Sequence, residues 1–289
     1  MPPPIPIGDG DLNLYNLGRS TATVPRIYYV NGIQTSPQDH AITASYLSLL
    51  VERPIVGVFN LSAGKGTVTG FLADIAQCLA DVLQNATARP FSSMNAGKPQ
   101  KIPEDKINDF LLNVEKQYFV WNRATLELFK ELVRHRHERQ LIIAHSQGNL
   151  ITSNALFVVE DVLGSGGLKN IRVYSLASPS PGWPLGLRIT NGGGGRQDNA
   201  FMNDMVSLLR PQNFAKKIGI GAFQNAGDFR TMPNAWPVGF APHDVNKIIE
   251  SLNFVKSIRG DLGLSKEFPP EFLQQCSRTA QAAFPNLAK

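Results

Sequence analysis

Short apolar runs alternate along the first two thirds of the chain with longer segments whose apolar residues recur at helical spacing. A short apolar run bounded by turn residues predicts a buried strand, whereas a sustained period of 3.6 residues predicts a helix. The predicted strands are 26–32, 54–60, 140–146, 171–177 and 185–190. The predicted helices are 39–52, 70–86, an interrupted region at 104–137, 147–163, and a short segment near 270–281.

This alternation predicts an α/β fold in which a mostly parallel sheet is flanked on both faces by helices. A chain of 289 residues is about as long as one large hydrophobic core supports. We therefore expect residues 1–289 to form a single domain, with a core over about 24–258 and a C-terminal tail at 259–289.

The composition is that of an ordinary soluble globular protein, with 43% hydrophobic and 18% charged residues. The formal net charge is +5, but the basic residues are scattered, and only 134–139 forms a basic cluster. That cluster ends a helical pattern, where cations complement the helix dipole. We therefore favour a structural role for it and expect no nucleic-acid partner.

The chain shows no targeting or membrane signal. Its first residues lack a positive segment followed by an apolar one, and no apolar run approaches the length of a membrane span. Cys78 and Cys276 are too few for a disulfide framework, so both are expected to be free thiols. Cytoplasmic residence without a membrane span is the resulting expectation.

The segment LIIAHSQGNL places Ser146 where a predicted strand turns directly into a predicted helix. Ala144 and Gly148 flank the serine two positions away on either side, and small residues there permit a tight turn. This A-x-S-x-G pattern is typical of a nucleophile elbow, which exposes the serine oxygen at the carboxyl edge of the sheet. The simpler alternative is a serine that only caps the helix.

With these elements around it, the chain resembles the α/β-hydrolase family, and more loosely its lipase-like and esterase-like branches, over about 24–258. The resemblance implies that Ser146 is the nucleophile. It also places Asn31-Gly32-Ile33 at the family's oxyanion loop, with Asn31 where histidine is common. The backbone N–H groups of Ile33 and Gln147 would then form the oxyanion hole.

The family order of nucleophile, acid and histidine directs the search for the other two catalytic residues. His243 is the only histidine after Ser146, and it precedes a segment of helical periodicity. Asp204 is the preferred acid because it follows the strand predicted at 185–190 and precedes an apolar run. Asp198 and Asp228 remain alternatives; Asp198 lies in a glycine-rich segment that we expect to be a mobile loop.

The expected activity is a lipase-like or esterase-like serine hydrolysis of small-molecule or lipid acyl esters through a Ser-His-Asp triad, with no cofactor and no metal. A thioesterase, amidase or acyltransferase could use the same triad, and a non-catalytic binding module could retain the turn as structure. Two segments, 87–105 and 211–241, are candidate lids; the second is rich in apolar residues.

Overall fold

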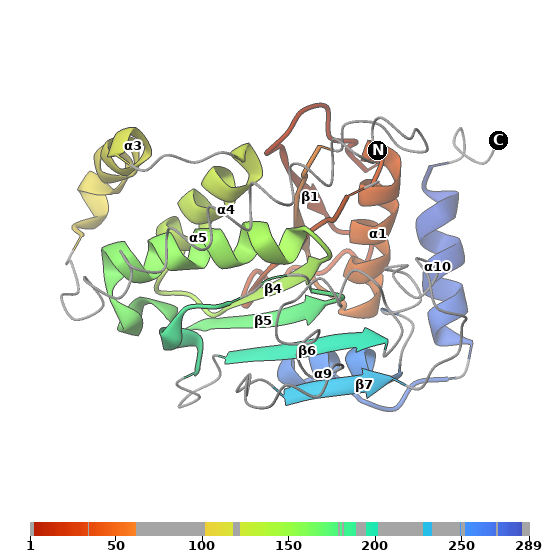
Figure 1. Ribbon diagram of the computed structural model, residues 1–289. Helices are drawn as coiled ribbons and strands as arrows, with labels where there is room; N and C mark the ends of the chain where they lie inside the picture. Colours follow the sequence, from red (N-terminus) through yellow and green to blue (C-terminus); the bar gives the residue numbers. More distant parts are fainter. Residues whose placement is uncertain are drawn as a thin grey trace.

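The computed structural model shows a sheet with helices on both of its faces (Figure 1). The described residues are 3–33, 35–61, 102–117, 122–178, 180, 182–188, 195–201, 228–232, 249, 252–269 and 271–284. The helix predicted at 70–86 and most of the two candidate lids lie outside them.

Within the described residues, seven strands form one sheet in the order β1-β3-β2-β4-β5-β6-β7. Only β1 runs antiparallel to its neighbour; the other pairs are parallel. The predicted α/β class with a mostly parallel sheet is therefore confirmed. The strands are β1 Leu12–Tyr15, β2 Arg26–Val30, β3 Ile55–Val58, β4 Gln140–His145, β5 Ile171–Leu176, β6 Gly195–Phe201 and β7 Asp228–Met232.

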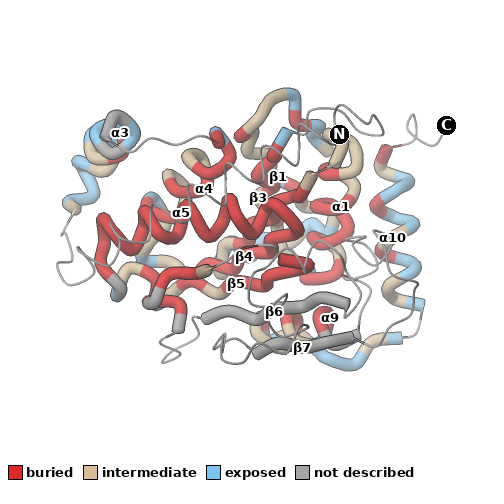
Figure 2. Tube along the Cα trace, in the orientation of Figure 1, coloured by how far each residue is buried: buried red, intermediate tan, exposed pale blue. Residues whose placement is uncertain are grey.

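Two layers of helices cover the sheet. Helices α1, α9 and α10 share one buried cluster with alternate residues of the central strands, and α4 and α5 share the other. Figure 2 shows α5 buried along its whole length. The helices are α1 Pro37–Leu50, α3 Ile107–Gln117, α4 Arg123–Arg134, α5 Gly148–Leu163, α9 Leu252–Asp261 and α10 Phe272–Ala282; the 3-10 turns are η1 Glu104–Lys106, η2 Ser165–Leu168 and η3 Leu185–Arg188.

Local signals explain where the helices begin. Ser36 caps α1, because its side chain accepts a hydrogen bond from the backbone N–H of Asp39. The carboxylate of Asp39 in turn accepts from the backbone N–H of Ser36. Asn122 caps α4 in a similar way, through the backbone N–H of Thr125. The predicted helical region 104–137 is thus interrupted, with a new helix beginning at Arg123.

The prediction of a strand at 185–190 is wrong, because Leu185–Arg188 forms η3 and the next strand is β6. The part of that glycine-rich segment that carries Asp198, residues 195–201, is therefore a strand rather than a mobile loop. Its backbone pairs with β5 on one side and with β7 on the other. Pairing along both edges stabilises a strand whose own sequence has a weak β pattern.

The candidate lid 211–241 contains the edge strand β7, so part of this segment belongs to the sheet. The expected core of 24–258 is also too short. Tyr15 lies in the core at one end of the chain, and Cys276, Ala280 and Phe284 lie in it at the other, where α10 packs against α1. The predicted tail therefore contributes to the core, because the apolar face of α10 covers α1.

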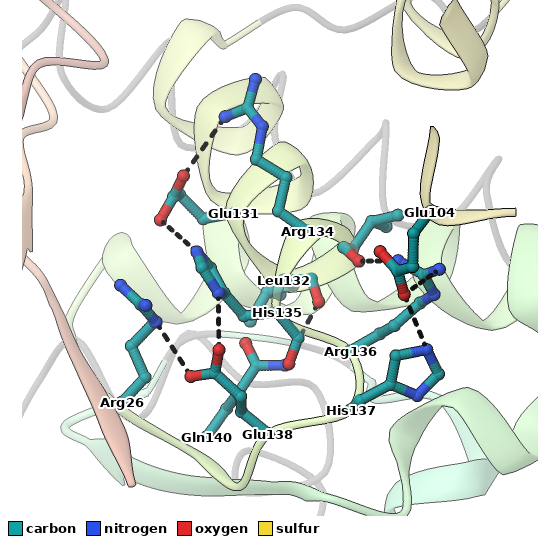
Figure 3. A network of polar contacts seen from close by, with 11 residues as sticks. Arg26, Glu104, Glu131, Leu132, Arg134, His135, Arg136, His137, Glu138 and Gln140 are labelled. Atoms are coloured by element: carbon teal, nitrogen blue, oxygen red, sulfur yellow. Dashed lines mark hydrogen bonds and ion pairs between the residues drawn. The ribbon is translucent and has the colours of Figure 1, made fainter. Parts of the chain in front are cut away.

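The basic cluster at 134–139 begins at the last residue of α4 and ends directly before β4, at the opposite end of that strand from Ser146. Figure 3 shows the side chains of Arg134, His135, Arg136 and His137 beside glutamate carboxylates. Arg134 forms an ion pair with Glu131 and Arg136 forms one with Glu104, while Nδ1 of His135 lies 3.0 Å from the carboxylate of Glu138.

None of the described helices is long and apolar enough to cross a membrane.

Candidate functional site

Ser146 occupies a strained turn between β4 and α5. Its φ angle is +54°, in the left-handed region that residues with a β-carbon rarely adopt; such a conformation costs about 1–3 kcal/mol. The turn is held on both sides. The backbone N–H of Ser146 donates to the carbonyl of Leu176 at 3.0 Å, and its carbonyl accepts from the N–H of Asn149 at 3.0 Å.

Two glycines allow other backbone segments to approach this turn. A β-carbon on Gly148 would lie 2.4 Å from the carbonyl oxygen of Val30, at the end of β2. A β-carbon on Gly32 would lie 2.3 Å from Cβ of Ser146 and 3.0 Å from its Oγ. Both positions therefore require glycine, and the loop after β2 lies directly against the serine.

Ala144, the departure from glycine in the elbow pattern, is accommodated within β4. It is fully buried and belongs to the hydrophobic cluster on the α4 and α5 face of the sheet. Its partners in register are Val30 on β2 and Ser175 on β5. The extra methyl group therefore lies in the core rather than in the turn.

The hydroxyl group of Ser146 is buried, and no described residue forms a hydrogen bond with it. The residue is 1% exposed, and its Oγ has no hydrogen-bond partner in the part of the chain that the structure describes. A buried polar group without a partner costs about 1–3 kcal/mol, and such groups in native structures often have a functional role. Strain and an unpartnered hydroxyl thus coincide at one residue.

A buried side-chain network surrounds the loop after β2. Asn31 donates through Nδ2 to the carbonyls of Gly32, at 3.0 Å, and Asn60, at 2.8 Å. Its Oδ1 accepts from the backbone N–H of Asn60 and lies 2.9 Å from Nδ1 of His40. All four hydrogen-bonding positions of the Asn31 side chain are therefore filled.

His40 is neutral in this network. Because Asn31 Oδ1 is an acceptor, Nδ1 of His40 carries the proton and donates it. The ring packs against the side chains of Tyr15, Tyr29 and Phe59. Burial in these surroundings lowers the pKa of His40 to about 3.

Asn60 extends the network to the turn itself. Its Nδ2 donates to Oε1 of Gln147 at 2.8 Å, and its Oδ1 accepts from Nδ2 of Asn122 at 3.0 Å. Asn122 in turn caps α4. Asn31 and Asn60, which follow β2 and β3, are therefore joined to Asn122 and Gln147, which precede α4 and α5. Together they form one buried polar cluster.

The N-terminal segment is hydrogen-bonded to residues at the same edge of the sheet. Asp9 accepts from the backbone N–H of Leu61, at 3.0 Å, and from that of Arg123, at 3.2 Å. Burial raises the pKa of Asp9, an effect that these backbone hydrogen bonds oppose. This carboxylate ties the segment after β3 to the start of α4.

The predicted site residues are only partly described. Ser146, Gln147 and Ile33 lie at the carboxyl edge of the sheet: Gln147 directly precedes α5, and Ile33 follows Gly32. Asp204 and His243 lie outside the described residues. Of the alternative acids, Asp198 is within β6, level with Ala144 of β4 through Ser175, and Asp228 begins β7.

The sequence reasoning missed the polar cluster, although part of a signal was present. Asn60 ends a predicted strand, and Asn31 lies within another near its end, where a parallel sheet places functional groups. His40 was set aside because it precedes Ser146. Asn122 signals only a helix start, and the contacts of Asn122 with Asn60 and of Asn149 with Leu176 join residues far apart in the sequence.

Among the described residues, no group of three or more histidine, cysteine, aspartate or glutamate side chains is arranged to hold a metal ion. Comparisons of the chain with protein families, with curated proteins and with solved structures give no significant match. The site therefore has to be interpreted from its own geometry.

Proposed function

We propose that this protein is a serine hydrolase of acyl esters with an α/β-hydrolase fold. The observation that carries the proposal is Ser146, a strained residue between a parallel strand and a buried helix, with Gly32 against it and no hydrogen bond from its hydroxyl to any described residue. A serine that only capped α5 would use its hydroxyl to accept a backbone N–H. No such bond is made to Ser146 Oγ by any described residue.

The strand order supports the other two assignments. β4, β5, β6 and β7 are parallel, so the chain leaves all four at the edge where Ser146 lies. In the sequence, Asp204 comes soon after the end of β6 at Phe201, and His243 comes after the end of β7 at Met232. This is the order in which the hydrolase family supplies its acid and its histidine.

In the proposed reaction, Ser146 Oγ forms a bond to the carbonyl carbon of the ester while its proton passes to His243. Asp204 orients His243 and stabilises its protonated form. The backbone N–H groups of Ile33 and Gln147 bind the oxyanion, each worth about 3 kcal/mol in the transition state. The alcohol then leaves with the proton held by His243, and water releases the acid from the acyl-enzyme by the same route.

The test is covalent labelling with a fluorophosphonate, followed by turnover of p-nitrophenyl esters of increasing chain length. We expect the reagent to modify Ser146, located by peptide mass spectrometry, and we expect Ser146→Ala to abolish both labelling and turnover. Ser153→Ala is the control, because Ser153 is also a buried serine of the same region but its hydroxyl donates to the carbonyl of Gly182.

Two results would refute the proposal. Labelling that persists in a folded Ser146→Ala protein would place the reactive group elsewhere. A folded wild-type protein that neither reacts with the fluorophosphonate nor turns over any ester would favour the non-catalytic binding module.

A further inference from the structure

Both proposed oxyanion donors belong to peptide groups whose carbonyl oxygens are bound by buried asparagine side chains. Ile33 N–H shares its peptide group with the carbonyl of Gly32, which accepts from Asn31 Nδ2 at 3.0 Å. Gln147 N–H shares its peptide group with the carbonyl of Ser146, which accepts from Asn149 Nδ2 at 3.0 Å.

The planarity of the peptide group makes this arrangement directional. In a trans peptide the C=O and the N–H point in opposite directions, and the only cis peptide bond recorded among the described residues is Val24–Pro25. A side chain that fixes the carbonyl oxygen therefore fixes the direction of the N–H on the other side. Asn31 acts in this way on the Ile33 amide, and Asn149 acts in this way on the Gln147 amide.

The orientation of each asparagine amide follows from its partners. Asn149 faces two carbonyl oxygens, those of Ser146 and Leu176, and a carbonyl only accepts, so the atom facing them is Nδ2. Asn31 likewise faces two carbonyls with Nδ2, and its Oδ1 accepts from a backbone N–H. Neither amide can rotate by half a turn without losing these bonds.

Asn60 connects the loop after β2, which carries Asn31, to Gln147 in the turn after β4. Its backbone binds the Asn31 side chain through both N–H and C=O, and its own side chain binds Gln147. Asn31, Asn60, Gln147 and Asn149 are all fully buried, where hydrogen bonds are strengthened by the low dielectric. The two donors are thus anchored to one rigid cluster rather than to two independent loops.

We propose that Asn31 and Asn149 are positioning residues that orient the N–H groups of Ile33 and Gln147 toward the oxyanion. This inference rests on the proposed hydrolase function. It explains why asparagine stands at position 31: its side chain supplies a donor to the Gly32 carbonyl while accepting from His40 and Asn60.

Asn149→Leu gives the sharpest test. The two side chains have similar shapes, and the change also removes Asn149 Oδ1, which is buried without a partner among the described residues. Each carbonyl that loses the amide keeps a backbone partner: the N–H of Asn149 for Ser146, and the N–H of Ser146 for Leu176. The fold should therefore tolerate the change, while the Gln147 amide loses its side-chain anchor.

Gln140→Met is the matched control. Gln140 is the first residue of β4, the strand that ends next to Ser146, and it is fully buried. Its Nε2 donates to the carbonyls of Leu132 and His135, and its Oε1 has no partner among the described residues. It thus repeats the bonding pattern of Asn149 away from Ser146. A purely structural role would give the two variants similar consequences.

The experiment compares the wild type, Asn149→Leu, Asn31→Leu and Gln140→Met by kcat and KM for p-nitrophenyl acetate, and by Ki for a trifluoromethyl ketone, which forms an oxyanion with the serine. We expect Asn149→Leu and Asn31→Leu to lower kcat about 10- to 100-fold, the loss typical of a misaligned donor. KM should stay within about twofold, as expected when only transition-state binding is lost, and Ki should rise in step with the loss of kcat. Gln140→Met should leave all three constants close to the wild type.

The inference is overturned if Asn149→Leu matches Gln140→Met in kcat and Ki, or if only KM changes. Asn149→Leu decides the matter even if Asn31→Leu, which leaves more groups unpaired, fails to fold. Fluorophosphonate labelling of the wild type distinguishes a failure of the positioning role from a failure of the proposed hydrolase function. If labelling occurs and Asn149→Leu is as active as the control, only the positioning role falls; if a folded wild type is inert, both proposals fall.

Discussion

Gly32 lies so close to Ser146 that a methyl group on Gly32 would stand 2.3 Å from the β-carbon of the serine. The two residues are far apart in the sequence and come together because β2 and β4 are adjacent parallel strands that end at the same edge of the sheet. The contact brings the predicted oxyanion loop against the predicted nucleophile.

Gly32→Ala should therefore disable the site. The added carbon requires either the loop after β2 or the strained turn at Ser146 to move, and a displacement of about 1 Å in a catalytic group can cost about 100-fold in rate. We expect kcat/KM for p-nitrophenyl acetate to fall by at least that factor. Gly166→Ala is the control, since a β-carbon there would meet nothing within 4 Å; equal activity of the two variants would contradict the prediction.

Ser146→Ala should stabilise the protein while abolishing activity. The substitution removes a buried hydroxyl that has no partner among the described residues, and the penalty of such a group is about 1–3 kcal/mol. Ser153→Ala should do the opposite and lower the free energy of unfolding by about 1 kcal/mol, because it breaks the bond to Gly182. Urea denaturation measures both changes, and a destabilised Ser146→Ala would argue for a structural role of this hydroxyl.

His40 should make the stability of the protein depend on pH. Burial lowers the pKa of His40 to about 3 in the folded state, against about 6.5 in an unfolded chain. Between these values the unfolded state binds a proton that the folded state does not, so the free energy of unfolding falls as the pH falls, by up to about 1.4 kcal/mol per pH unit.

His40→Leu, a change of similar volume in apolar surroundings, should flatten this dependence in urea denaturation between pH 7 and pH 4. His137→Gln is the control, because the side chain of His137 is 76% exposed and the substitution leaves the buried His40 in place. A slope unchanged in His40→Leu would show that other groups produce the pH dependence.

Asp204→Asn should abolish ester turnover, and Asp198→Asn should not. A catalytic acid acts from beyond the carboxyl end of its strand, whereas Asp198 lies within β6, level with a residue that precedes the nucleophile on β4. Replacing the acid by asparagine favours the wrong histidine tautomer and costs about 10⁴ in the best-studied triad. Turnover and circular dichroism should be measured for both variants; an inactive, folded Asp198→Asn would move the acid to β6.

The sequence alone determined the α/β class, most of the strands and helices around the central sheet, and the turn at Ser146. These features are local, because a hydrophobic period or a small-residue turn depends on a few neighbouring positions. Asp204 and His243 stay predictions of the same kind, since they come from the order of motifs along the chain.

Tertiary structure decided what local patterns do not contain. β6 is a strand because β5 and β7 pair with both of its edges, and α10 belongs to the core because α1 lies beside it. The cluster of Asn31, Asn60 and Gln147 exists only because three chain segments end at one edge of the sheet. A buried amide is stable only when its partners are present, and those partners are supplied by residues that the fold, not the sequence neighbourhood, brings together.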